Sequence, residues 1–528
     1  MTPDFQVLDA MRREATERLD QSRRGELGQF LTPSPIARFM ADMFTINQPV
    51  RLLDAGAGIG SLTGAFVARA RAAGVSVHAE AWEIDPLLRT YLGSSFQSWA
   101  EDGTVPGFTF LGEVHPGDFI EDGAINLLMR RGTRFTHAIL NPPYKKLNGA
   151  SHRRNLLSKA GIEAVNLYAA FLGLAIELTE PGGEIVAIIP RSFCNGAYYR
   201  PFRALMLDRC AIRRIHLFKA RDKAFVEDGV LQENLILHLS RGGTQGTVDV
   251  TTSTDASFVD LALSSRIFEE IVQPGDHELF IRIPVDGVES QLPSGGGRSL
   301  SDIGLEVCTG PVVDFRVRAH WLMEMESGAA PLVYARHFLG GRCVHPQTGT
   351  KKPEALTRGP EVDKWLMPKG HYVVVKRLSS KEERKRLVAS VVCPDDLEGP
   401  AWGFENHLNV FHRQRGGMDG DIAWGLAAFL NSTLADRQFR VFSGHTQVNA
   451  TDLRSMNYPG IGLLRSIGQE AAHMEWEQEN IDALIERMGV GHEGRAKAHQ
   501  GSHRDLERFG LAKRTAERKD GHLPLGFA

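Results

Sequence analysis

The chain has 528 residues, a formal net charge of −3, 42% hydrophobic residues and 24% charged residues. At roughly 100–200 residues per domain this length predicts two to four domains, and the composition is ordinary for a soluble globular protein. Because the net charge is close to zero, any nucleic-acid surface must come from local clusters of basic residues.

The five cysteines form no CxxC pair, which excludes a zinc ribbon or a dense disulfide framework and favours the cytoplasm. No apolar run reaches the ~20 residues needed to span a bilayer, so no membrane association is expected, and the mixed charge of the N-terminus is unlike a signal peptide.

The chain begins with two predicted helices, one over residues 5–22 and one that follows Pro33 and Pro35 over 36–44. From residue 50 to about 240, short apolar strands alternate with helices. The predicted strands cover 50–56, 77–85, 136–140, 184–190, 212–218 and 231–239, and the helices between them cover 61–73, 86–99, 166–180 and 201–210. This alternation predicts an α/β fold with a parallel, doubly wound sheet that binds ligands at the carboxyl ends of its strands.

The alternation of strands and helices ends after about residue 240. Residues 241–255 are polar and glycine-rich, which indicates a linker or an edge hairpin. Residues 246–465 mix short strands with irregular loops and one clear helix at 421–439, so a second domain of α+β type is predicted there. Residues 466–528 are predicted to be helical at first and then basic and polar. The expected organisation is an α/β domain at 1–245, an α+β domain at 246–465 and a C-terminal extension at 466–528.

A glycine-rich turn, LLDAGAGIG at 52–60, follows the first predicted strand. Its glycines let the backbone approach a ligand, and the helix that follows offers free N–H groups. The spacing G-x-G-x-G differs from the G-x-G-x-x-G of dinucleotide sites. Glu83 ends the next strand, where a carboxylate accepts hydrogen bonds from ribose hydroxyls, and Asp118 follows a third strand, where it can hold an adenine amino group. The three features together predict a nucleoside site. The alternatives are a tight strand–helix connection for the glycines and helix or turn caps for Asp85 and Asp118.

The tetrapeptide Asn141-Pro142-Pro143-Tyr144 follows the predicted strand at 136–140. Two prolines restrict the backbone, so the Asn141 side-chain oxygen and the Pro142 carbonyl are held as a rigid pair of acceptors. An aromatic amine is a poor nucleophile because its lone pair is delocalised into the ring. Two acceptors that bind both amino hydrogens draw the nitrogen toward tetrahedral geometry, while Tyr144 can stack on the base and hold it in line with a methyl sulfonium. The motif predicts methylation of an aromatic amine; the alternative is an ordinary proline turn with an asparagine cap.

These motifs resemble those of class I S-adenosylmethionine-dependent methyltransferases. Their order is similar to that of the gamma-class amino-methyltransferases of bacterial restriction–modification systems, because GQFLTP at 28–33 precedes the glycine turn and NLYAAF at 166–171 follows NPPY. The resemblance is strong over 25–240 and looser over 300–460. It implies a Rossmann-like catalytic domain, a DNA target-recognition domain at 246–465 and S-adenosyl-L-methionine as cofactor. It also implies double-stranded DNA as substrate, adenine N6 as methyl acceptor and a cognate restriction endonuclease as a partner in the system.

The resemblance assigns site residues by position. The implied cofactor-binding residues are Thr32, Asp54, Gly56, Gly58, Glu83, Ile84, Asp118 and Asn141. The implied catalytic residues are Asn141, Pro142, Pro143 and Tyr144, and the implied target-base pocket consists of Tyr144, Phe171 and Phe225. The family stacks a second aromatic residue on the base just before its final strand; a plain core or loop position is the alternative for Phe225. No metal is expected, because positioning and electrostatics carry the step and the histidines, including His407 and His412, show no ligand spacing.

A base inside a duplex cannot reach the methyl donor, so base flipping is implied. Basic residues that predict a phosphate-binding strand and loop are Lys376, Arg377, Lys381, Arg384, Lys385 and Arg386. The alternative is a solvated charged turn in which Glu382 and Glu383 are the partners. The polar segment 443–449, with His445 and Asn449, is predicted to reach base edges or the gap left by the flipped base, although its alternative is a plain surface loop. The basic tail beyond residue 495 either adds non-specific DNA affinity or is solvated.

Other functions fit part of the pattern. An NPPY methyltransferase acting on protein glutamine or on RNA uses the same chemistry, but the 220 residues at 246–465 favour DNA. A fused restriction endonuclease–methyltransferase needs a carboxylate–lysine metal site, and Pro394-Asp395-Asp396 lacks a following Glu-x-Lys. A non-catalytic DNA-binding subunit has no use for an intact NPPY. The sequence therefore predicts a site-specific, adenine-specific DNA methyltransferase.

Overall fold

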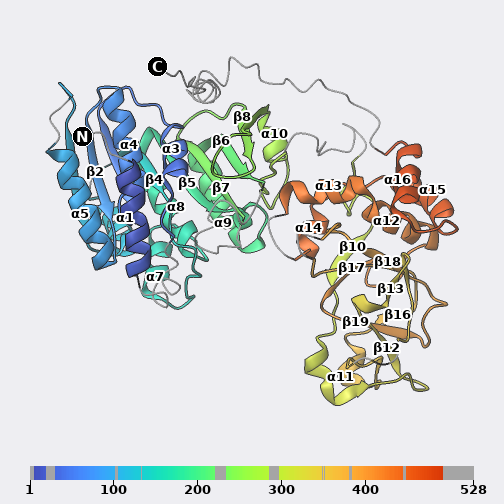
Figure 1. Ribbon diagram of the computed structural model, residues 1–528. Helices are drawn as coiled ribbons and strands as arrows, with labels where there is room; N and C mark the ends of the chain where they lie inside the picture. The colour runs from blue at the N-terminus through green and yellow to red at the C-terminus, as the bar shows by residue number, and fades with distance from the viewer. Residues whose placement is uncertain are drawn as a thin grey trace, which may run out of the picture. The chain divides into compact units, whose positions relative to one another are not determined.

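The computed structural model describes residues 5–19, 30–101, 105–131, 134–219, 233–284, 297–347, 349, 351–379, 383–443 and 447–490. They form two compact units, one comprising the described residues up to 284 and the other comprising those from 297 to 490 (Figure 1). Each unit has its own hydrophobic core. Within the described ranges, every helix is too short or too polar to span a membrane.

A nine-stranded sheet forms the centre of the first unit, in the order β3-β2-β1-β4-β5-β7-β6-β8-β9. All strands run in one direction except β7, which pairs antiparallel with β5 and β6, and β9, which pairs antiparallel with β8. The strands are Val50–Ala55 (β1), Val77–Trp82 (β2), Phe110–His115 (β3), Phe135–Leu140 (β4), Thr179–Pro190 (β5), Cys210–Phe218 (β6), Asn234–Arg241 (β7), Val248–Ser253 (β8) and Ala262–Arg266 (β9). The predicted doubly wound sheet is thus confirmed, with two antiparallel strands added to its parallel set.

Helices cover both faces of this sheet (Figure 1). One face is packed by Phe5–Arg18 (α1), Ser34–Ala41 (α3), Ser61–Ala72 (α4) and Pro86–Ala100 (α5). The other face is packed by Phe119–Met129 (α6), His152–Lys159 (α7), Leu167–Leu178 (α8) and Arg200–Arg209 (α9). The short helix Phe268–Ile271 (α10) follows β9. Because both faces are covered, a central strand such as β4 is buried along its whole length, including its two polar residues Thr136 and His137.

The first unit continues past the boundary predicted at residue 245. The glycine-rich segment 241–255 is not a linker between the units, because it contains β8, which pairs with β6 in parallel; β9 then folds back on β8 as the edge strand. Val248 and Val250 on β8 belong to the same core as the helices α6 to α9. Backbone pairing and apolar burial therefore keep the described residues up to 284 in the first unit.

The second unit contains two small sheets. One has the order β10-β20-β17-β18-β14-β13 and the other the order β11-β15-β12-β19-β16. Their strands are Glu306–Thr309 (β10), Trp321–Leu322 (β11), Ala330–Val333 (β12), Phe338–Leu339 (β13), Arg342–Cys343 (β14), Ala355–Leu356 (β15), Met367–Pro368 (β16), Tyr372–Lys376 (β17), Ala389–Val392 (β18), Ala401–Phe404 (β19) and Leu408–His412 (β20). The short helix Pro360–Asp363 (α11) lies between β15 and β16. This unit is of the predicted α+β type.

Helices complete the second unit and correct two predictions. They are Gly420–Asn431 (α12), Thr433–Phe442 (α13), Ala450–Arg454 (α14), Ile461–Ala471 (α15) and Gln478–Arg487 (α16). The single helix predicted at 421–439 is two helices, because Ser432 has extended backbone angles and its hydroxyl accepts a hydrogen bond from Ala435 N at 3.1 Å. The boundary predicted at residue 465 falls inside α15, which packs against α12 through Gly425 and Gly468.

Candidate active site

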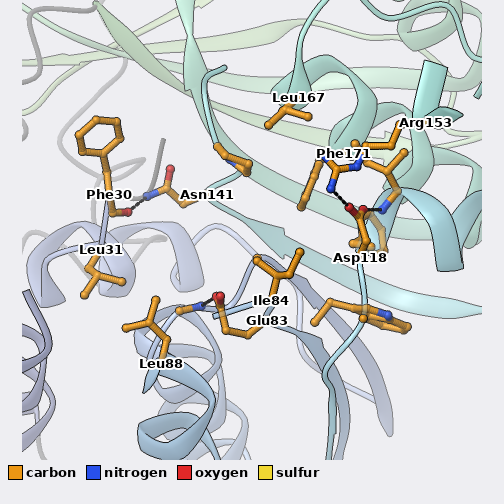
Figure 2. A pocket seen from close by; sticks show the side chains of 17 residues that line it. Phe30, Leu31, Glu83, Ile84, Leu88, Asp118, Asn141, Arg153, Leu167 and Phe171 are labelled. Atoms are coloured by element: carbon orange, nitrogen blue, oxygen red, sulfur yellow. Dashed lines mark hydrogen bonds and ion pairs between the residues drawn. The ribbon is translucent and has the colours of Figure 1, made fainter. Parts of the chain in front are cut away.

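A cavity of about 750 Å³, including its open mouth, lies at the carboxyl ends of β1, β2, β3 and β4 (Figure 2). Parallel strands end at the same edge of a sheet, so the residues that follow them meet there. The lining residues are Phe30, Leu31, Gly56, Gly58, Trp82, Glu83, Ile84, Leu88, Gly117, Asp118, Phe119, Ile120, Asn141, Pro143, Arg153, Leu167 and Phe171. The structure therefore brings together the glycine turn, both predicted carboxylates and the NPPY motif.

The glycine turn leaves room that a side chain would fill. Gly56 and Gly58 have φ angles of 75° and 58°, in the left-handed region that favours glycine. A Cβ atom on Gly58 would come within 2.8 Å of the Leu31 side chain, and one on Gly56 would lie 3.5 Å from Phe171. The turn is held to the next strand because Gly56 N and Ala57 N both donate to Trp82 O at 2.9 Å.

Glu83 is 4% exposed and lies at the base of the cavity. One carboxylate oxygen accepts a hydrogen bond from Gly58 N and the other accepts one from Asp85 N, both at 2.8 Å. Burial raises the pKa of Glu83 to about 7. Each oxygen has a second lone pair available for a ligand hydroxyl. The alternative reading of Asp85 is confirmed, because its side chain caps α5 by accepting from Leu87 N.

Asp118 both caps a helix and faces the cavity. Its Oδ1 accepts from Ile120 N at 2.8 Å at the start of α6, and its Oδ2 forms an ion pair with Arg153 of α7. Figure 2 shows Arg153 and Phe171 beside this carboxylate. Phe171 also packs against Phe119, with ring centroids 5.2 Å apart. No spacing in the sequence connects Arg153 with Asp118, so the sequence analysis missed it.

Asp54 was predicted to bind the cofactor, but it does not line the cavity. Its side chain is fully buried under the glycine turn, and Asp54 Oδ2 accepts a hydrogen bond from the Thr63 hydroxyl at 2.6 Å. Burial raises the pKa of Asp54 to about 7. Asp54 therefore supports the glycine turn by joining β1 to α4. A change at Asp54 could reach a ligand in the cavity only by shifting the backbone of this turn.

The NPPY motif is held by the segment before α3. Asn141 Nδ2 donates to Phe30 O and to the Thr32 hydroxyl, each at 2.9 Å. The Tyr144 hydroxyl donates to Asn141 Oδ1 at 3.1 Å, and the Tyr144 ring lies between Phe30 and Tyr168, with centroids 6.0 and 6.3 Å away. Burial raises the pKa of Tyr144, so its hydroxyl stays a donor. Thr32, predicted as a cofactor residue, thus contacts the motif itself.

Comparison with known proteins identifies the family. The model of the Eco57I restriction-modification methylase family matches residues 118–225. The chain is 46% identical over 497 residues to the type II methyltransferase M.BsuBI from Bacillus subtilis, with 91% of this chain and 96% of that protein covered. The chain belongs to the type II methyltransferases of restriction–modification systems. Accordingly, it is a DNA methyltransferase with a class I catalytic fold and S-adenosylmethionine as its cofactor.

Two other proteins are similar to this methyltransferase. The type II methyltransferase M.PstI from Providencia stuartii is 41% identical over 486 residues, with the same coverage of 91% of this chain and 96% of that protein. The cryo-EM structure of a DrdV–DNA complex is 13% identical, with a TM-score of 0.48, and the match covers 88% of this chain and 59% of that chain.

In the second unit of the methyltransferase, the two segments predicted to contact DNA lie side by side. Val448 N donates to Arg377 O at 2.8 Å, and Leu378 forms a β-bridge with Gln447. Asn449 caps α14 and is half-buried. Residues 444–446, and with them His445, lie outside the described residues, as does Phe225 in the first unit.

The basic cluster on and after β17 is only partly exposed. Lys376 pairs with Glu383 at 3.3 Å, and Arg377 donates to Asn406 O at 3.1 Å. Arg386 was predicted to belong to the phosphate-binding loop, but it is fully buried, with its guanidinium 5.4 Å from the Phe439 ring. Arg386 is therefore a core residue of this unit, whereas Lys376 and Arg377 are partly exposed and Arg384 is exposed.

Two histidines and a glutamate converge elsewhere in the second unit. His337 Nε2 and His345 Nε2 lie 3.2 and 3.4 Å from the Glu354 carboxylate. His345 Nε2 also lies 2.9 Å from Glu354 O, so this nitrogen carries a proton. Both ring nitrogens of His337 face N–H donors, Tyr334 N and Arg336 Nε, at 3.1 Å. The two imidazoles and the carboxylate form a hydrogen-bonded network in which each residue brings one possible ligand atom to within 4.8 Å of the others.

Proposed function

We propose that this methyltransferase transfers the methyl group of S-adenosylmethionine to the N6 amino group of an adenine flipped out of double-stranded DNA. The observation that carries the proposal is the single cavity in which Glu83, Asp118 and Asn141 converge from successive strand ends. Two of these are acids suited to a nucleoside, and the third is an amide acceptor suited to an aromatic amine.

The residues present fit S-adenosylmethionine. We assign the two oxygens of Glu83 to the ribose hydroxyls and Asp118 to the adenine amino group of the cofactor. Ile84 and Phe171 line the same cavity, and we assign them to the two faces of the cofactor adenine. The sequence analysis placed Phe171 beside the target base, whereas its contact with Phe119 and its position near Asp118 support a place on the cofactor. The bound cofactor supplies a methyl group on a positively charged sulfur.

The NPPY residues then handle the target amine. We assign Asn141 Oδ1 and the carbonyl of Pro142 as acceptors for its two hydrogens, which localises the lone pair on nitrogen. Pro142 and Pro143 keep these acceptors in place because their φ angles are restricted. Tyr144 provides a face on which the base can stack, and Phe225 remains a candidate for its other face. Because Asn141, Pro142, Pro143 and Tyr144 are positioned before the substrate arrives, little reorganisation of this motif is needed during transfer.

We assign target recognition to the second unit. The adjacency of residues 376–378 with 447–449 supports a shared DNA-binding edge that includes Lys376, Arg377 and Asn449. His445, outside the described residues, remains a candidate from the sequence. A restriction endonuclease that cuts the same sequence is the partner expected in such a system, and a cytoplasmic location follows from a DNA substrate. Adenine N6 is preferred over cytosine N4 from the order of the motifs along the chain.

The test is methylation by the purified protein with labelled S-adenosylmethionine and duplexes of varied sequence, followed by mass spectrometry of the released nucleosides. We expect N6-methyladenine in DNA and a loss of transfer in Asn141→Ala with cofactor binding retained. The matched control is Asn148→Ala, which removes an exposed asparagine outside the cavity. Label in N4-methylcytosine, in RNA or in protein glutamine would contradict the proposal, as would an Asn141→Ala variant with normal turnover.

A further inference from the structure

We propose that Thr32 is a positioning residue for methyl transfer. Its hydroxyl, together with the carbonyl of Phe30, determines which end of the Asn141 amide faces the reacting amine. The inference rests on the role proposed above for Asn141, and it changes the role of Thr32 from a cofactor contact to a support for the NPPY motif. It concerns the segment 30–32, which precedes α3 and lies against the end of β4.

The argument begins with the asymmetry of an amide. Asparagine has an acceptor oxygen at one end and two N–H donors at the other, and a half-turn of the side chain exchanges them. Asn141 Nδ2 lies 2.9 Å from Phe30 O and 2.9 Å from the Thr32 hydroxyl, so each of its hydrogens has an acceptor. Figure 2 shows Asn141 directed toward the backbone oxygen of Phe30. In this orientation Asn141 Oδ1 is the end left for a ligand.

The opposite orientation would defeat the chemistry. A reversed amide would set Asn141 Oδ1 against the Phe30 carbonyl, two oxygens with no hydrogen between them. It would also present N–H groups to the amine of the base, a donor facing a donor. The Tyr144 hydroxyl, 3.1 Å from Asn141 Oδ1, cannot make this choice by itself because a hydroxyl both donates and accepts. The orientation is therefore decided by the acceptors of segment 30–32.

Of the two acceptors that bind the Asn141 NH2 group, only the Thr32 hydroxyl can be removed by a side-chain substitution, because the other is the backbone carbonyl of Phe30. It is 5% exposed, so an N–H group that lost the Thr32 acceptor would have little access to water. Without the Thr32 acceptor, the NH2 end of the amide would be held by the Phe30 carbonyl alone, and its orientation would be less restricted. The lost hydrogen bond should slow the chemical step, whereas a direct cofactor contact would change mainly the affinity for the cofactor.

The experiment compares Thr32→Val, which keeps the shape but removes the acceptor, with Thr32→Ser, which keeps the hydroxyl. Ser34→Ala is the matched control, because Ser34 is 4% exposed and its hydroxyl donates to Phe5 O rather than to Asn141. The readouts are the single-turnover methylation rate at saturating cofactor and DNA, and the Kd for S-adenosylmethionine. We expect Thr32→Val to lower the rate on the order of tenfold with little change in Kd, and both other variants to stay near the parent rate.

Two outcomes would overturn the inference. A Thr32→Val variant with the parent rate and weaker cofactor binding would make Thr32 a cofactor ligand. An equal loss of rate in Thr32→Ser would show that packing, and not the hydroxyl, is responsible. If Thr32→Val does not fold, as judged by its melting temperature, the comparison passes to Thr32→Ala and Thr32→Ser. Full activity in Asn141→Ala would instead refute the proposed function, so the two failures can be told apart.

Discussion

Replacing Glu83 with glutamine is expected to weaken cofactor binding on the order of 10- to 150-fold. The two carboxylate oxygens face the N–H groups of Gly58 and Asp85, both at 2.8 Å. A glutamine must direct its NH2 group at one of these donors, and its single oxygen is then needed by the other. Because an amide oxygen has two lone pairs, the variant keeps one acceptor for the ribose hydroxyls where the carboxylate offers two. A hydrogen bond to a charged group contributes about 1.5–3 kcal/mol, and about 1.4 kcal/mol corresponds to tenfold in Kd.

The same geometry predicts a pH dependence. Burial raises the pKa of Glu83 to about 7, and ribose hydroxyls donate to its ionised form, so the cofactor prefers the deprotonated protein. As the pH falls below 7, Glu83 takes up a proton that binding must remove, and Kd should rise by up to about tenfold per pH unit. Above 7 the carboxylate is already ionised and Kd should level off. Glu83→Gln has no such proton and should lose this dependence.

Titration calorimetry with S-adenosylmethionine at pH values on both sides of 7 measures these effects. Asp54→Asn is the control, because burial also raises the pKa of Asp54 to about 7 but Asp54 does not line the cavity. We expect this control to keep the pH dependence of the parent. A Kd that is flat across the range in the parent protein, or a Glu83→Gln variant with parental affinity, would refute the reasoning.

Three other outcomes test the rest of the molecule. Gly468→Ala should destabilise the second unit by about 1–3 kcal/mol, because its Cβ would lie 1.6 Å from a carbonyl oxygen of α12. Gly462→Ala on the same helix is the control: its Cβ has open space, so it should stabilise the unit by about 0.5–1 kcal/mol. Urea denaturation of both variants measures the two changes in the free energy of unfolding. Neutralising Lys376 and Arg377 should weaken DNA binding and reduce the slope of log K against log salt by about one per lost phosphate contact, and an unchanged slope would count against that surface. Burial lowers the pKa of His216 to about 3, so below about pH 6.5 the unfolded chain takes up a proton that the folded chain does not. As the pH decreases below that value, the free energy of unfolding should therefore decrease by up to about 1.4 kcal/mol per pH unit. His216→Gln should make this pH dependence weaker.

Much of the candidate site could be predicted from the sequence because its residues follow strands directly. Glu83 and Asn141 come directly after β2 and β4, and Asp118 follows shortly after β3; parallel strands deliver such residues to one edge. The glycine turn could also be predicted, because closely spaced glycines after a strand indicate backbone angles that other residues rarely adopt. Gly56 and Gly58 do have such angles in the structure. These features can be predicted from the local sequence, without knowing which elements pack around them.

Other features had no local signal. The charge of Arg386 predicted a solvent-facing loop, yet packing against Phe439 buries it fully. The glycine-rich run after residue 240 fitted a linker or an edge hairpin, and only the pairing of β8 with β6 and with β9 showed that it contains a strand of the first unit's sheet. Arg153 reached Asp118 through the packing of α7 beside α6, which no spacing in the sequence encodes.

The sequence by itself predicted the chemistry of this methyltransferase, because residue type and strand-end position indicated a nucleoside site and a pair of rigid acceptors. The tertiary structure alone decided how those acceptors are oriented. Thr32 and Asn141 are 109 residues apart in the chain, and their 2.9 Å hydrogen bond exists only because the segment before α3 folds against the end of β4. Contacts between distant segments depend on how whole elements pack, which the pattern within each element does not specify.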